Sequence, residues 1–179
     1  VNSHKAIMLG SNLIIVMMSF CALGAFNPLE LNSTSADTSK ELIILHTNDL
    51  HSRLAGYAPE SESTPLTTGD DRTIGGFARI ARLIKQEKDR NTGSVLVLDA
   101  GDFLMGTLFH ALEPTDGFQL RLMKEMGYDA VSIGNHEFDF GIKSTAEIIQ
   151  NSAKNGQIPS ILLANIEFNA SHGDDDGLE

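Results

Sequence analysis

Carboxylate, imidazole and amide side chains recur in three short segments of this sequence, each directly after an apolar run. The segments are Asp49-Leu50-His51, Gly101-Asp102 and Gly134-Asn135-His136-Glu137-Phe138-Asp139. Carboxylates, imidazoles and amide oxygens are the ligands that hard and borderline divalent cations take from proteins. Two such cations held about 3.5–4 Å apart stabilise both the attacking and the leaving oxygen of a phosphoryl displacement. The pattern therefore predicts a two-metal site for phosphate ester hydrolysis.

The spacing within the first two segments suggests how each residue would bind. Asp49 and His51 are separated by one residue, so in an extended chain their side chains project to the same side, and we expect both to bind one cation. Asp102 follows Gly101, which allows a tight turn and close approach to a ligand. Its two oxygens let it bridge two cations. Asp99 is expected instead to end a strand and accept a hydrogen bond from loop backbone.

The third segment offers a ligand and a proton donor. The amide oxygen of Asn135 adds no negative charge to a site that must accept phosphate, and we expect it to bind the second metal. His136, its neighbour, is expected to point away from the metals and to donate a hydrogen bond to a phosphate oxygen or protonate the leaving oxygen. Asp139 would hold the His136 ring in the tautomer that this role needs.

These segments need a sheet and helices to bring them together. The predicted strands are 42–47, 94–99, 130–133 and 160–164. The predicted helices are 76–88, 116–126 and 144–156, the last opened by a capping box at Ser144-Thr145-Ala146-Glu147. Alternation of strands and helices predicts an α/β fold with a largely parallel sheet, and the continuous hydrophobicity of the strands predicts that both faces are covered. Ligands bind at the carboxyl ends of the strands in such sheets.

Composition limits the classes of partner. The formal net charge is -11, from 24 acidic and 13 basic residues, which disfavours a nucleic-acid or anionic-membrane binder because these need a basic surface. An anionic small substrate stays compatible, since bound cations reverse the local charge of a carboxylate-rich site. A dinucleotide-binding domain is disfavoured because the sequence lacks the Gly-x-Gly-x-x-Gly turn. The single cysteine, Cys21, cannot form an internal disulfide.

The first 26 residues have the composition of an export segment. A mostly apolar run from Ala6 to Phe26 follows Lys5 and ends in small residues, as in a secretory signal peptide. A membrane anchor is the alternative, because the run is about as long as the ~20 residues that span a bilayer. Residues 27–40 are predicted to be a linker, and 55–73 a long surface loop. We therefore expect an extracytoplasmic location, in the periplasm, at the cell surface or secreted.

The three motifs, in this order and spacing, resemble those of the 5′-nucleotidase branch of the calcineurin-like metallophosphoesterases. The resemblance covers roughly residues 41–165 and rests on 44–51, 98–107 and 134–139. It implies a metallophosphoesterase-type layered sheet and helix domain, of which residues 41–179 would be the N-terminal part. It also implies two divalent ions, zinc or manganese, and a metal-activated water that attacks phosphorus. The implied ligands are Asp49 and His51 for one metal, Asp102 as the bridge and Asn135 for the second, with His136 and Asp139 assisting phosphate transfer.

The sequence departs from this family after the third motif. Complete relatives supply further histidine ligands and then a C-terminal domain that holds the nucleoside, and the 179 residues contain neither. We therefore expect the domain to be incomplete at its C-terminus, and the substrate domain to belong to a longer protein. Four ligands shared by two ions predict weak metal binding and little turnover for this fragment alone. The other histidines are read as structural (His46), helical (His110), in a loop (His172) and in the export segment (His4).

The leading functional hypothesis is hydrolysis of nucleoside 5′-monophosphates to nucleoside and phosphate. A 2′,3′-cyclic-nucleotide phosphodiesterase or a nucleotide-sugar hydrolase would use the same motifs, so these alternatives stay open. A noncatalytic binding module that retains the fold is the alternative from another class. Presence of all six site residues together argues against it, because a purely structural sheet does not require them.

Overall fold

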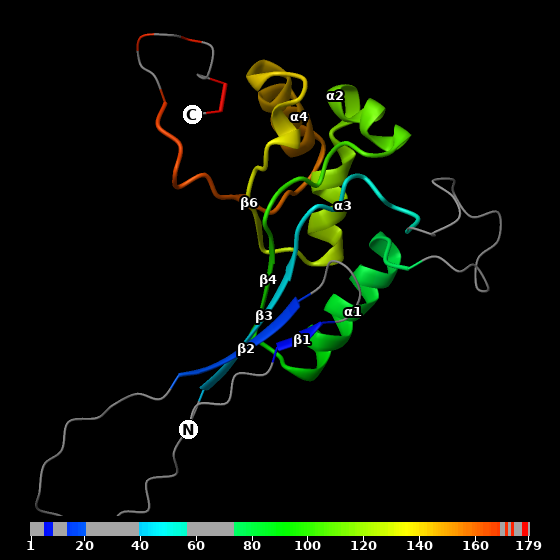
Figure 1. Ribbon diagram of the computed structural model, residues 1–179, viewed down its shortest axis with the longest axis vertical. Helices are drawn as coiled ribbons and strands as arrows, with labels where there is room; N and C mark the ends of the chain where they lie inside the picture. Colours follow the sequence, from blue (N-terminus) through cyan, green and yellow to red (C-terminus); the bar gives the residue numbers. More distant parts are fainter. Residues whose placement is uncertain are drawn as a thin grey trace, which may run out of the picture.

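A six-stranded sheet with a layer of helices makes up the computed structural model (Figure 1). The structure describes residues 6–8, 14–20, 40–56 and 74–168, with Ser171, Gly173, Gly177 and Leu178 near the end of the chain. In chain order the strands are β1 (Ala6–Met8), β2 (Ile14–Phe20), β3 (Lys40–Thr47), β4 (Val95–Asp99), β5 (Ala130–Val131) and β6 (Ser160–Ile161). Neighbours from β3 to β6 are parallel, whereas β1, β2 and β3 pair antiparallel. The predicted α/β fold with a largely parallel sheet is confirmed.

The helices connect the parallel strands. They are α1 (Phe77–Arg90), α2 (Glu113–Asp116), α3 (Phe118–Met126) and α4 (Ile142–Asn155), with short 3₁₀ helices η1 (Leu108–Leu112) and η2 (His136–Phe138). Helix α3 contacts both α1 and α4, and in Figure 1 α1 and α3 lie along the same side of the strands. Crossovers between parallel strands are right-handed in nearly all proteins. A sheet in the order β3-β4-β5-β6 therefore receives its connecting helices on one face.

This order explains one error of the sequence-based expectation. Along β3, Ile43 and Leu45 are buried at 5% and 0% exposure, whereas Leu42 is 37% exposed and His46 is half-buried. In the described residues, then, the helices cover only one face of the sheet. Continuous hydrophobicity predicts two covered faces, but strand order decides where the helices go.

The core lies between the sheet and these helices. It joins strand residues to residues of α1, α3 and α4; the most buried include Leu45, Val97, Val131, Ile84, Leu120, Met123 and Ile148. Phe103 and Tyr128, at 1% and 0% exposure, extend it towards the loops that follow β4 and precede β5. Full burial of one such side chain contributes about 1.5–3 kcal/mol. The loops at the carboxyl ends of the strands are thus attached to a packed support.

Several element boundaries differ from the predicted ones. Strands β5 and β6 end at Val131 and Ile161, before the predicted ends at 133 and 164. The predicted helix 116–126 is divided by Gly117, whose φ of 62° ends α2 and precedes α3. Helix α4 begins at Ile142, after Gly141, so the predicted capping box at Ser144 is wrong. The Thr145 hydroxyl instead donates to the Glu137 carbonyl at 2.5 Å, because η2 lies against the start of α4.

The N-terminal predictions fall largely outside the described residues. Strands β1 and β2 lie within the predicted export segment, but Cys21, residues 27–39 of the linker and residues 57–73 of the long loop are not among those described. Among the residues that are described, no helix has the length and apolar character that crossing a membrane requires. The signal peptide, the anchor and the linker stay predictions.

Candidate functional site

The loops that follow β3, β4 and β5 meet at one edge of the sheet. The Asp49 N–H donates to the Gly101 carbonyl at 3.0 Å, and the His51 N–H donates to the Asp102 carbonyl, also at 3.0 Å. The His136 N–H donates to Oδ1 of Asp102 at 2.9 Å. These bonds join all three predicted motifs, as expected for the carboxyl ends of parallel strands.

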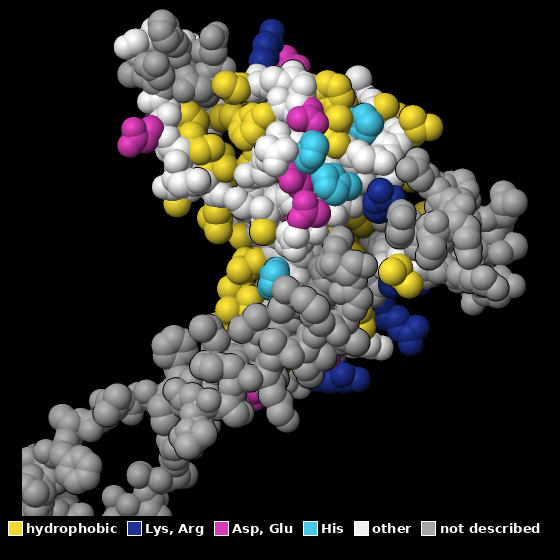
Figure 2. Space-filling model, viewed as in Figure 1, with side chains coloured by type: hydrophobic (Ala, Val, Ile, Leu, Met, Phe, Trp, Pro, Cys, Tyr) yellow, Lys and Arg dark blue, Asp and Glu magenta, His cyan; other side chains and the backbone are white. Residues whose placement is uncertain are grey.

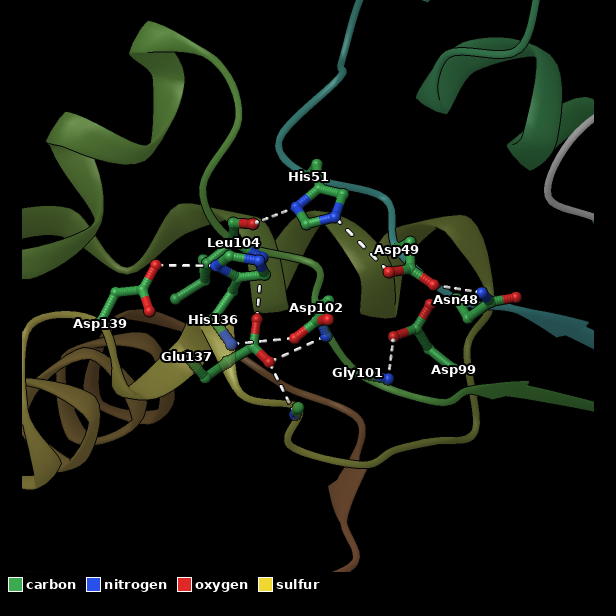
Figure 3. Close-up of polar contacts among 11 residues, drawn as sticks. Asn48, Asp49, His51, Asp99, Gly101, Asp102, Leu104, His136, Glu137 and Asp139 are labelled. Atoms are coloured by element: carbon green, nitrogen blue, oxygen red, sulfur yellow. Dashed lines mark hydrogen bonds and ion pairs between the residues drawn. The ribbon is translucent and has the colours of Figure 1, made fainter.

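Three side chains form a cluster that fits a metal ion. His51, Asp102 and His136 each offer one ligand atom, and these atoms all lie within 4.8 Å of one another. Asp49 lies beside them, with its Oδ1 3.5 Å from Nε2 of His51. Figure 3 shows the two imidazole rings close to the Asp102 carboxylate, with Asp49 to one side. Imidazole and carboxylate together suit zinc or manganese, so the residues present fit the implied metal.

His136 lies closer to this cluster than its sequence position suggested. The rings of His51 and His136 are edge to face, with centroids 5.0 Å apart. The 3₁₀ turn η2 produces this, since the His136 backbone is bound to Asp102 while its side chain turns back over the same carboxylate. His136 was expected to point away from the metals; its ring lies beside His51 and Asp102, and its role stays a prediction.

Asp139 makes the contact that the sequence predicted. Its Oδ2 lies 2.7 Å from Nδ1 of His136, and both side chains are more than a third exposed. This hydrogen bond is the main cause that raises the pKa of His136. Asn135, just before η2, is exposed, and its metal-binding role stays a prediction. Figure 2 shows histidine and acidic side chains side by side on this face, with hydrophobic side chains around them.

Left-handed backbone is concentrated in the two loops that carry Asp49, His51 and Asp102. In the described residues the non-glycine positions with positive φ are Asp49 (54°), His51 (48°), Ser52 (52°), Asp102 (58°) and Met105 (64°). Such residues are uncommon, cost about 1–3 kcal/mol each when surrounding contacts force them, and gather at functional sites. Here the paired backbone hydrogen bonds between the loops hold them.

Two glycines allow these loops to touch. A Cβ atom on Gly101, whose φ is 101°, would lie 2.4 Å from the Gly134 nitrogen, and a Cβ on Gly134 would lie 2.2 Å from Oδ1 of Asp102. Any side chain at either position would separate the loops after β4 and β5. The prediction that Gly101 permits a tight turn is confirmed.

Glu137 connects the loops of the site. It lies in a motif of the sequence, but no role was predicted for it. It is 1% exposed, and its carboxylate accepts three backbone N–H bonds from two loops. Oε2 accepts from Asp102 at 2.9 Å and from Gly134 at 2.8 Å, while Oε1 accepts from Leu104 at 2.9 Å. An acidic residue between His136 and Asp139 was the only signal, since burial is not visible in a motif.

A second buried network of hydrogen bonds lies at the ends of β3 and β4, where the same loops begin. Thr47 donates to Asp99 at 2.5 Å and contacts the Tyr128 hydroxyl at 2.7 Å, and Asp99 accepts from the Gly101 N–H at 3.0 Å. The predicted role of Asp99 at the strand end is confirmed, whereas Thr47 and Tyr128 were missed. Burial is the main cause that raises the pKa of Asp99 to about 7, and burial also raises the pKa of Tyr128.

Glu113, at the start of α2, is another buried carboxyl group. It is 1% exposed, and burial raises its pKa from 4.5 to about 7. Of the nearby charged groups, Asp116 also raises this pKa and Arg121 lowers it. A carboxyl group whose pKa is raised by folding stabilises the folded state below the unfolded pKa. That contribution is lost as pH rises through the folded value.

We therefore expect replacement of Glu113 by Gln to remove part of the pH dependence of stability. Relative to Glu113→Gln, the wild-type free energy of unfolding should fall by about 3 kcal/mol between pH 4.5 and pH 8, at ~1.4 kcal/mol per pKa unit. Urea denaturation across this range measures it. Glu125→Gln, an exposed change on α3, is the control and should follow the wild type. Parallel curves for wild type and Glu113→Gln would contradict the assignment.

Of the remaining histidines, His46 and His110 are described and are not part of the cluster. His110 is in η1, so its predicted helical position is confirmed, and its ring packs 5.9 Å from that of Phe140. His4 and His172 fall outside the described residues.

The chain is similar in sequence to a family of phosphoesterases and to several 5′-nucleotidases. Residues 42–176 match the family model described as calcineurin-like phosphoesterase. The 5′-nucleotidase of Bos taurus is 41% identical over 128 residues, which cover 71% of this chain and 21% of that protein. A snake venom 5′-nucleotidase of Gloydius brevicauda is 40% identical over 129 residues, covering 72% of this chain and 20% of that protein.

A solved structure shares the fold. The structure of the Haemophilus influenzae NAD nucleotidase matches with a TM-score of 0.55 and 30% sequence identity, covering 73% of this chain and 21% of that one. The chain thus spans about a fifth of the length of the relatives it matches.

Proposed function

Because this chain belongs to the calcineurin-like phosphoesterase family, we propose that it carries the metal-binding part of an enzyme that hydrolyses nucleoside 5′-monophosphates. The observation that supports this most directly is the cluster of His51, Asp102 and His136 with Asp49 beside it. The relatives with about 40% identity are 5′-nucleotidases. The proposed substrate is a nucleotide, and the proposed reaction is cleavage of its phosphate ester.

We assign the metal ligands as the sequence predicts. Asp49 and His51 would hold one divalent ion, Asp102 would be a ligand shared with the second, and the Asn135 amide would complete the set for that second ion. Zinc or manganese fits these ligands. When bound, the ions supply an activated water and neutralise charge on the phosphoryl oxygens.

His136 and Asp139 are assigned to proton transfer. The Asp139 carboxylate accepts from Nδ1 of His136, which leaves Nε2 as the nitrogen free to act on the substrate. A protonated His136 donates to a phosphate oxygen or to the departing ester oxygen. The position of its ring beside His51 and Asp102 supports a second role, direct metal binding.

Replacement of His136 by Gln separates these two roles. If His136 transfers a proton, phosphate release from AMP should fall by about 10²- to 10⁴-fold, while zinc affinity stays within tenfold of the wild type. Single-turnover assays with protein in excess, and calorimetric zinc titration, measure the two quantities. His110→Gln, outside the cluster, is the control. Equal loss of zinc affinity and of phosphate release would instead make His136 a metal ligand.

Cleavage of larger nucleotides is the second candidate activity. The likeness to an NAD nucleotidase favours a hydrolase of dinucleotides or nucleotide sugars, and a 2′,3′-cyclic-nucleotide phosphodiesterase would use the same residues. A panel of AMP, 2′,3′-cyclic AMP, UDP-glucose and NAD with zinc or manganese distinguishes these activities. A protein that binds nucleotide and hydrolyses none of them would be the noncatalytic module.

We further propose an extracytoplasmic location and a longer protein. The apolar composition of residues 1–26 supports a signal peptide or membrane anchor, followed by a linker at 27–40. One relative is a venom protein, which is in keeping with export. Residues 41–179 would form the N-terminal part of the metallophosphoesterase domain, and a C-terminal domain of the longer protein would hold the nucleoside. Periplasmic or culture-medium fractionation of the expressed gene tests the location.

A further inference from the structure

Ser52, which follows His51, is fixed at every polar atom. It is 0% exposed and has a φ of 52°. Its N–H donates to the Phe103 carbonyl at 2.9 Å, and its own carbonyl accepts from the Thr107 hydroxyl at 2.7 Å and from the Leu54 N–H at 2.9 Å. Its Oγ accepts from Nε2 of Gln119 at 2.9 Å. The position of His51 thus depends on a turn that is held from α3.

Gln119 connects this turn to a buried carboxyl group. It is 0% exposed on the first turn of α3, and its backbone N–H donates to Oε1 of Glu113 at 3.1 Å. Gln119 therefore links Glu113 to Ser52, with its backbone N–H bonded to the Glu113 carboxyl group and its side-chain amide bonded to the Ser52 hydroxyl.

Two atoms of this chain lack a partner among the described residues. Oε2 of Glu113 and Oε1 of Gln119 are both buried and make no hydrogen bond there. Both are acceptors, and two acceptors bond to each other only if one carries a hydrogen. A carboxyl group gains that hydrogen when burial disfavours its charge. A protonated Glu113 would satisfy both atoms at once.

We propose that protonated Glu113 and Gln119 form a buried relay that positions the turn carrying His51. The Glu113 hydroxyl donates from Oε2 to Oε1 of Gln119, which fixes the orientation of the amide. The amide nitrogen then donates to Ser52 and holds it in its left-handed conformation. Glu113 and Gln119 are positioning residues, since neither touches the cluster. The value of the relay for metal binding rests on the proposed function, but its effect on the turn does not.

Amide hydrogen exchange of the metal-free chain tests the relay directly. The His51 and Ser52 amides, bonded to the next loop, should exchange at least about tenfold faster in Gln119→Leu, relative to core amides of β3 and β4. Ser52→Ala, which removes only the acceptor oxygen, should do the same if Gln119→Leu fails to fold. Leu120→Ala, at an equally buried position of α3, is the control and should leave the ratio unchanged. An unchanged ratio in both Gln119→Leu and Ser52→Ala would overturn the relay.

Two substitutions of Glu113 test its proton. Glu113→Gln keeps an oxygen for the Gln119 N–H and places an N–H₂ where the carboxyl hydroxyl would be, so exchange should match the wild type. Glu113→Leu removes both and should accelerate exchange like Gln119→Leu. Fast exchange in Glu113→Gln would show that Glu113 acts as an ionised acceptor and would overturn the protonated relay.

Zinc titration then separates the relay from the proposed function. If His51 binds metal, Gln119→Leu should weaken zinc binding by about 10- to 100-fold, as loss of an outer supporting partner does. A wild-type chain that binds no zinc while the exchange pattern holds would contradict the proposed function and leave the relay supported.

Discussion

Replacement of Asp102 by Asn should abolish metal binding while leaving the fold intact. Asn keeps the Oδ1 acceptor for the His136 N–H, which lies 2.9 Å away, but it loses the charge and the second oxygen that bridging needs. We expect zinc affinity to fall by more than about 100-fold, since even outer partners cost 10–100-fold. Phosphate release should fall by about 10³-fold, because several kcal/mol of transition-state stabilisation is lost. Zinc titration and phosphate assays measure both.

An exposed aspartate provides the matched control. Asp89→Asn removes the same charge from α1, where the carboxylate pairs with Lys85 at 2.8 Å in solvent, and neither quantity should change. Circular dichroism should show the same fold in both variants. Full zinc affinity in Asp102→Asn would remove Asp102 from the metal site, and with it the central assignment.

Replacement of Glu137 by Gln exchanges only one oxygen for an amide nitrogen, yet we expect it to lower the free energy of unfolding strongly. The two carboxylate oxygens accept from Asp102, Gly134 and Leu104, whereas Gln has one acceptor oxygen and turns an N–H₂ towards at least one of these donors. A buried donor without a partner costs about 1–3 kcal/mol, and more when the lost acceptor was charged. We expect the free energy of unfolding to fall by about 3 kcal/mol, measured by urea denaturation.

The same substitution on the surface shows what the charge alone contributes. Glu147→Gln, on the exposed side of α4 and 4.0 Å from Lys143, should change the free energy of unfolding by less than about 0.5 kcal/mol. Equal effects of the two substitutions would mean that Glu137 does not organise the loops. Zinc affinity of Glu137→Gln should fall as well, because Asp102 loses the anchor on its backbone.

Much of the architecture follows from patterns of the sequence. Apolar runs and helical spacing place β3, β4, α1 and α3 within a few residues of their observed bounds, because buried strands and amphipathic helices leave periodic signals. The meeting of the three motifs at one sheet edge follows from parallel strand topology. Family resemblance supplies the ligand assignments, which substitution experiments now have to test.

Other features depend on burial and strand order, which no local pattern contains. The supporting roles of Glu137, Thr47 and Tyr128 arise from loops that touch only after folding. The ring of His136 reaches the cluster because η2 turns it back, whereas its place in the motif suggested the opposite direction. In the residues that the structure describes, the helices cover one face of the sheet because of the order of the strands, which hydrophobicity does not encode.

The residues with left-handed backbone in the two loops lower the stability of the fold, but most of them also have proposed roles in the site. At Asp49, His51, Ser52, Asp102 and Met105 glycine would relax the main chain, but glycine at the first four would delete a proposed ligand or an anchor of the turn. At these positions a substitution that raises thermal stability would therefore lower activity. A lineage under pressure to withstand heat would have to gain its stability in the helices and core, and leave this edge of the sheet strained.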